Sequence, residues 1–207
     1  MKMINSGNMN PLAIPLVGVM LLVTTGSSVM MAGTDDADMN LDQIVIDTIN
    51  WLIQLPKIEN AYGEYTTVGG EQVIHRVVLH IRQYVRCPLD VSQLSVQLRN
   101  DRDILILPYS GACANSKESG IFLSTVWDQD VEGFHIITVM DKDNSVQNTS
   151  VINGDAVFIC ITLPESFYLH QDETMTVTII TGTGAMTSIV LEGPLYGGYN
   201  IISFRDP

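Results

Sequence analysis

Residues 73–85 read VIHRVVLHIRQYV, and this stretch sets the pattern on which the rest of the fold is predicted. The apolar side chains of one parity are Val73, Val77, Leu79, Ile81 and Val85, and the more polar ones of the other parity are Arg76, His80, Arg82 and Tyr84. A period of two residues is typical of a β-strand that buries one face and keeps the other in water. The stretch therefore predicts a half-buried strand with one wet face.

Further short segments alternate in the same way or form brief apolar runs separated by turn residues. They cover 94–99, 104–107, 121–126, 134–140, 156–163, 174–179, 188–191 and 200–204. No helical period lies between these segments, which excludes parallel βαβ units and favours an antiparallel sandwich or barrel of about nine strands. We assign residues 57–207 to this β-sandwich domain.

The amino-terminal part has a different pattern, because no charged residue lies between Lys2 and Asp35. Residues 11–33 read PLAIPLVGVMLLVTTGSSVMMAG, which reaches the roughly 20 apolar residues that a membrane span needs. Apolar residues then recur at helical spacing from Leu41 to Ile53, ahead of Pro56. The predicted fold class is thus α+β: a candidate leader at 1–8, a long hydrophobic and amphipathic helix at 9–56, and an antiparallel sandwich.

Three interpretations of the apolar segment remain open. It is a cleaved secretory signal, a permanent membrane anchor, or a helix that leaves the membrane and packs against its copies in a polymer. A helix that is apolar on all sides must be buried. The sandwich fills its own interior with side chains from both sheets, so the helix has to find burial elsewhere.

The composition narrows the classes of partner. Among 207 residues, 23 are acidic and 10 are Lys or Arg, for a formal net charge of −13. Such an acidic surface repels phosphate backbones, so we expect no nucleic-acid partner. Hydrophobic residues reach 46%, which excludes a disordered chain.

A search for catalytic and metal-binding motifs favours a protein that is not an enzyme. The sequence contains no HExxH, CxxC or GxSxG motif. His75 and His80 have opposite parity on one predicted strand, so they are expected on opposite faces, unable to share a metal. Asp141-Lys142-Asp143-Asn144 alternates oxygen ligands as calcium loops do, but it lacks the EF-hand glycine and glutamate. We therefore assign no catalytic residue, no cofactor and no metal ligand, and leave a bound ion at 141–144 open.

Cysteines and one sequon are the remaining features of note. Cys160 falls in a predicted strand, where a buried free thiol is ordinary. Cys87 and Cys113 fall in predicted loops, and whether they pair stays open. The sequon Asn148-Thr149-Ser150 lies in a predicted polar loop, so Asn148 is a candidate glycosylation site.

Several motifs, in this order along the chain, resemble archaellins, the archaeal flagellins that polymerise into the motility filament. They are Ala61–Tyr65 followed by Val73–Arg82, Pro88–Val96, Ile152–Ile159 followed by Leu163-Pro164, and a closing hairpin over Val177–Ile180, Gly184 and Ile189–Pro194. The likeness covers about 130 residues at low identity. The order of the motifs is more specific than any single one.

The resemblance implies a structural, motility-related subunit with an immunoglobulin-like β-sandwich that faces the medium. It also implies leader cleavage by a membrane peptidase, membrane insertion before assembly, and an extracellular filament of homo- or heteropolymeric archaellin subunits joined through their N-terminal helices. Glycosylation is common in the family, which supports Asn148 as a candidate glycosylation site. The alternative is a membrane-anchored or pilin-like cell-surface binding module, or an accessory archaellum protein with the same sandwich.

Overall fold

The structure is a computed structural model that describes residues 46, 48, 49, 55–83, 87–116, 120–129, 132–193 and 200–204. The chain divides into two compact units, 1–47 and 48–207, and the strands belong to the second. The predicted leader at 1–8 lies outside the described residues, as does most of the predicted helix at 9–56, in which Ile46, Thr48 and Ile49 are helical. Among the described residues, no helix has the length and apolar character needed to cross a membrane.

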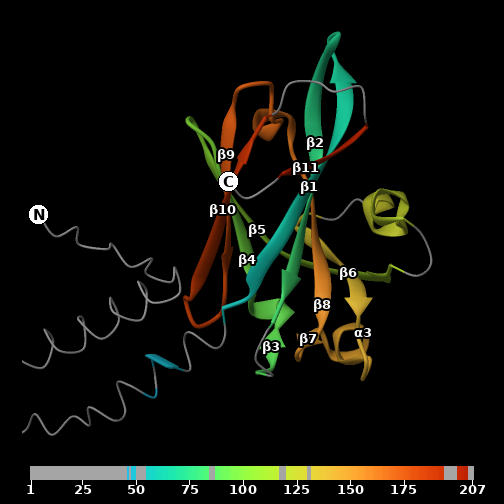
Figure 1. Cartoon of the computed structure of the whole chain (residues 1–207), viewed down its shortest axis with the longest axis vertical. Helices are drawn as coiled ribbons and strands as arrows, with labels where there is room; N and C mark the ends of the chain where they lie inside the picture. The colour runs from blue at the N-terminus through green and yellow to red at the C-terminus, as the bar shows by residue number, and fades with distance from the viewer. Residues whose placement is uncertain are drawn as a thin grey trace, which may run out of the picture. The chain divides into compact units, whose positions relative to one another are not determined.

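Strands dominate the described ranges (Figure 1). They are β1 Lys57–Val68, β2 Glu71–Arg82, β3 Leu89–Asp90, β4 Ser95–Arg99, β5 Ile104–Asn115, β6 Phe134–Met140, β7 Val151–Ile152, β8 Ala156–Thr162, β9 Thr174–Ile180, β10 Met186–Glu192 and β11 Ile201–Phe204. The short helical segments are the 3-10 turns η1 Val91–Gln93, η2 Ile121–Leu123, η3 Thr125–Asp128 and η4 Glu165–Phe167, and the α-helix α3 Ser145–Thr149.

Two layers form a sandwich, which confirms that part of the predicted fold class. The first layer has the order β10-β9-β4-β5, and the second has the order β5-β6-β8-β2-β1-β11. β5 belongs to both layers, because residues 104–108 pair with β4 and residues from Tyr109 onward pair with β6. The β5–β6 pair is parallel. The expectation of a purely antiparallel sandwich is therefore wrong at this pair. The described residues of the connection form η2 and η3 and contain no crossover α-helix.

One large apolar core lies between the two layers. It joins inward side chains of the first layer, such as Val96 and Val177, to those of the second, such as Leu79 and Ile159, all of them fully buried. Alternation in β4 and β9 predicted these positions correctly, because both strands bury only one face.

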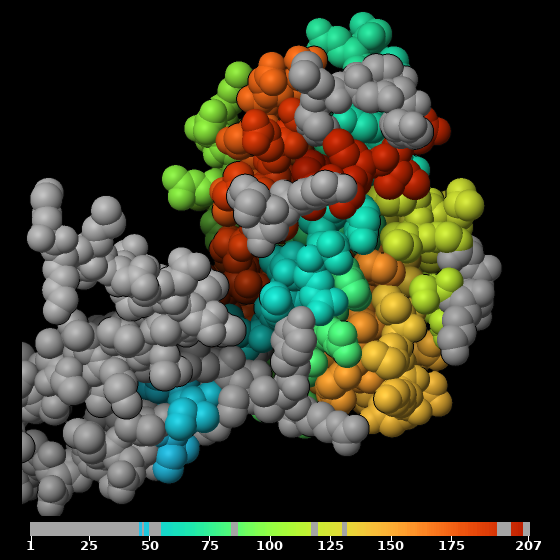
Figure 2. All heavy atoms as spheres, viewed as in Figure 1, coloured from blue at the N-terminus to red at the C-terminus, as the bar shows by residue number. Residues whose placement is uncertain are grey.

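A second, smaller apolar cluster covers the opposite face of the second layer. It contains Val78, Phe122, Val126, Ile137, Phe158 and Cys160. Figure 2 shows the yellow-green segment that carries η2 and η3 on the surface beside the orange atoms of β8. The predicted wet face of the 73–85 strand is therefore wrong at Val78, which is fully buried.

The segment 121–126, predicted as a strand, instead forms two 3-10 turns. Ser124 interrupts the apolar run, and its hydroxyl accepts a hydrogen bond from the Val126 N–H at the start of η3. Phe122 and Val126 are buried while Leu123 stays 81% exposed, which is the pattern of a short helix lying on a sheet.

Sequence alternation also missed β1, whose sequence KIENAYGEYTTV carries few large apolar side chains. Gly63 explains part of the local packing, since a Cβ there would press on Ile74 and Phe204. β1 pairs with β2 along its length and with β11 at Ala61–Glu64, and these partners fix it as a strand.

Candidate functional site

The outer side of the β1–β2 ribbon carries a group of ionisable side chains centred on Glu64. The pairing between the two strands shifts by one residue here, so that His75 forms a bulge between Ile74 and Arg76. His75 Nε2 lies 3.8 Å from Glu64 Oε2, and Arg76 Nη1 donates to the same oxygen at 2.9 Å. The bulge interrupts the alternation, because Ile74 and Val77 both face the main core.

Arg76 connects this group to η3. Its guanidinium lies 4.9 Å from the ring centroid of Trp127, a cation–π contact. Burial and the neighbouring Arg76 charge lower the pKa of His75, although the Glu64 carbonyl and carboxylate oppose the shift. The neutral imidazole is therefore favoured, and its Nδ1 lies 3.1 Å from the Glu64 carbonyl oxygen.

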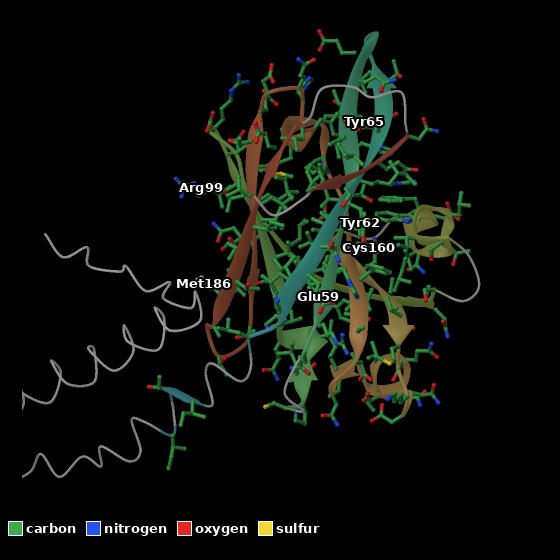
Figure 3. All side chains as sticks on the ribbon, in the orientation of Figure 1. Glu59, Tyr62, Tyr65, Arg99, Cys160 and Met186 are labelled. Atoms are coloured by element: carbon green, nitrogen blue, oxygen red, sulfur yellow. The ribbon has the colours of Figure 1, made fainter. Side chains whose placement is uncertain are left out.

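A second group of the same composition surrounds Glu59, which is labelled in Figure 3. His80 Nδ1 lies 3.4 Å from Glu59 Oε2, and Arg82 Nη1 lies 3.9 Å from Glu59 Oε1. The His80 ring also packs on Phe158 of the second cluster, with ring centroids 5.0 Å apart. The prediction that His75 and His80 face opposite sides is wrong because of the bulge, yet each histidine has its own glutamate.

His135 lies at the corner where β5 changes layers. Its Nδ1 is 2.6 Å from Ser110 Oγ, which also accepts a hydrogen bond from the Ala112 N–H. Burial lowers the pKa of His135, which is 3% exposed. The contact links β6 to the bulged part of β5, and the ring borders an open groove of about 670 Å³ whose walls include Trp127.

Asp141 and Asp143, named from the sequence as alternating oxygen groups, are joined in space by Asp155. One carboxylate oxygen of each lies within 4.8 Å of those of the other two. Local groups already bind these carboxylates: the Ser145 N–H donates to Asp143, and the Asn153 N–H donates to Asp155. Hydrogen bonds from Ser145 help lower the pKa of Asp143. Three clustered carboxylates offer oxygen ligands of the kind that hard divalent cations prefer.

Asp155 was missed as a member of this cluster. It is 4% exposed and follows the turn at Asn153-Gly154. A helix, α3, and a short strand, β7, separate it from Asp143 along the chain. Only the tertiary fold brings the two segments together. Asp155 was visible in the sequence as an aspartate after a turn, but its proximity to Asp141 and Asp143 was not.

Asn148 is exposed, but it lies in α3 rather than in the loop that the sequence suggested. Its N–H donates to the Asn144 carbonyl at 3.0 Å, as a short helix requires. Glycosylation of Asn148 stays a prediction.

All three cysteines are free, so Cys87 and Cys113 do not pair. Cys160 is fully buried, as expected, and burial strongly raises the pKa of its thiol. Cys113 lies in β5 rather than in a loop, and burial raises the pKa of its thiol to about 11. Both are poor nucleophiles, because only the thiolate reacts.

Known structures supply the comparison that decides the fold. The crystal structure of archaeal flagellin FlaB1 from Methanocaldococcus jannaschii superimposes with a TM-score of 0.62 at 18% identity, over 72% of this chain and 94% of that one. The described domain has the archaellin fold. No protein-family model and no curated protein sequence matches the chain.

Two further structures match the chain with lower TM-scores. The archaeal flagellum of Methanospirillum hungatei strain JF1 gives a TM-score of 0.48 at 15% identity, over 91% of this chain and 93% of that one. The archaellum periplasmic stator complex FlaF and FlaG from Sulfolobus acidocaldarius gives 0.38 at 13% identity, over 66% of this chain and 87% of that one.

Proposed function

We propose that this protein is a structural subunit of an archaeal motility filament. In this proposal the N-terminal segment packs with its copies in the filament core, and the β-sandwich forms the outer, extracellular surface. The subunit is inserted in the membrane before assembly, a membrane peptidase removes its leader, and membrane assembly machinery transfers the mature chain to the filament. It polymerises with itself or with other archaellins, needs no cofactor and catalyses no reaction.

The archaellin fold of the described domain is the observation that carries this proposal. Two properties of the chain support it independently. The uncharged stretch between Lys2 and Asp35 has to be buried, and the sandwich core is already filled by its own side chains. The ionisable groups around Glu59 and Glu64 are paired with bases across two strands, which suits a structural role.

Isolation of surface filaments tests the proposal directly. Filaments sheared from cells should contain peptides of this chain, and electron microscopy of cells that lack it should show fewer or altered filaments. An accessory or membrane-anchored protein would instead remain with membranes after alkaline carbonate extraction and would be missing from every filament. That result would refute the filament role.

A substitution in the apolar segment provides a sharper test. Val19→Asp should abolish assembly, because a carboxylate in a dry helix core has a large desolvation cost. Val19→Leu is the matched control and should assemble normally. If Val19→Asp filaments form at the normal yield, the segment does not build the filament core.

A further inference from the structure

The outer face of the first layer is an ordered lattice of side chains that point away from the second layer. Cross-strand pairing places them in three rows of four, because paired residues of neighbouring strands share a face. The rows are Met186, Ile180, Ser95 and Pro108; Ser188, Thr178, Gln97 and Ile106; and Val190, Thr176, Arg99 and Ile104. We call this set the lattice face.

Large apolar side chains are unusually exposed on the lattice face. Ile104, Ile106, Met186 and Val190 are 61%, 59%, 57% and 62% exposed. The remaining positions are mostly hydroxyl and amide groups, with no carboxylate in the three rows, although the chain has 23 acidic residues. Acids border the face at one end, where Asp101 and Asp103 line a pocket with Arg99 and where Glu192 pairs with Thr174. Exposed apolar patches that contain few charged residues are typical of protein contact surfaces.

Arg99 is the single charge of the lattice face, and Figure 3 shows it and Met186 projecting to the same side of the first layer. No ion pair to Arg99 occurs within the described ranges, whereas Arg76 and Arg82 each contact a glutamate of β1. An exposed guanidinium amid apolar and hydroxyl groups is suited to a carboxylate brought by a partner.

We infer that the lattice face binds a second copy of this chain, at a different and acidic part of that copy's surface; this inference rests on the proposed filament role and deepens it. The three rows contain no carboxylate, whereas the chain has 23 acidic residues outside them. An open helical filament repeats a contact between two different surfaces, so the lattice face meets another part of the second copy, where a carboxylate pairs with Arg99. The contact is heterologous.

The extent of the face agrees with a repeated contact. Four strands about 4.8 Å apart and three rows about 6.8 Å apart cover about 400 Å². One side of a stable two-protein interface covers about 800 Å². The lattice face alone is thus too small for a lasting dimer, and it acts together with a second contact along the polymer.

The rate of Met186 oxidation measures whether the lattice face is buried in native filaments. Isolated filaments and the same full-length chain dispersed in detergent are treated with hydrogen peroxide, and sulfoxide is measured by mass spectrometry. Met186 should oxidise about five-fold more slowly in filaments, since methionine oxidation follows exposure. Met140 of β6 is the internal control and should change by less than about two-fold.

Charge variants test the role of Arg99. Arg99→Glu should lower the assembled fraction by about ten-fold, because it places like charges together, whereas Arg99→Lys should retain most of it. Lys142→Glu changes the net charge by the same amount at an exposed loop position and should assemble normally.

The outcomes separate the two ideas. Filaments that contain the chain but leave Met186 as reactive as in detergent overturn the lattice-face contact and leave the filament role intact. Met186 protection that persists in dispersed single chains also overturns it, because the chain's own segment then covers the face. Absence of the chain from all filaments overturns both.

Discussion

Replacement of Gly133 by alanine should destabilise the sandwich at the corner where β5 passes between its layers. Gly133 has φ of +128° and precedes β6, and a Cβ there would overlap the carbonyl oxygen of Pro108. A side chain in this backbone region costs about 1–3 kcal/mol. Forcing extra volume into a packed site costs a further amount of about 1–3 kcal/mol.

Gly111→Ala is the matched control. Gly111 also has a positive φ, of +85°, and it lies in the bulged part of β5, but a Cβ there meets no atom within 4 Å. Backbone strain is common to both variants, so their difference isolates the overlap with Pro108, about 2 kcal/mol. For a domain of this size that corresponds to about 4–8 °C in Tm.

Thermal unfolding of the full-length chain in mild detergent, followed by circular dichroism, measures this difference. The wild type should have the highest Tm, Gly111→Ala an intermediate one and Gly133→Ala the lowest. If the Tm of Gly133→Ala lies within about 1 °C of the Tm of Gly111→Ala, the claim that β5 closely approaches the start of β6 is wrong.

Two further predictions concern the second cluster and the buried histidine. Phe122→Ala should cost about 3–5 kcal/mol in unfolding free energy, while Leu123→Ala, in the same turn but exposed, should stay within about 0.5 kcal/mol of wild type by denaturant titration; equal effects would contradict the covered face. Burial lowers the pKa of His135 in the folded protein, whereas in the unfolded chain the imidazole titrates at about 6.5. The unfolded chain therefore binds more protons below that pH. The stability that the neutral His135 contributes should be complete above about pH 6.5 and should fall as the pH decreases toward the folded-state pKa. The Tm should drop between about pH 7 and 5, in the same direction as the contribution of His75, and His135→Gln should reduce the slope; an unchanged slope would contradict the assignment.

Sequence alternation predicted the one-sided strands well and failed where a strand is covered on both faces. In β4 and β9 the inward residues are the apolar ones, as expected. Val78 of β2 could not be recognised as buried, because its cover comes from 3-10 turns far along the chain, in a run that itself looks like a strand. The decisive information is tertiary, and a local period does not contain it.

In the candidate sites, too, the sequence predicted local patterns and missed contacts that form only on folding. The acidic pair Asp141 and Asp143 was visible as a local pattern, but Asp155 joins it only through folding. The ionisable groups of the β1–β2 ribbon were missed because β1 was not recognised. The bulge at His75 then changed which side chains meet, since one inserted residue reverses the faces of a strand.

The sharing of β5 has a mechanical consequence. One continuous backbone crosses from Pro108 in the first layer to Tyr109 in the second. A pull on either layer is therefore transmitted through covalent bonds, and the layers cannot shear past each other without tearing hydrogen bonds from β5.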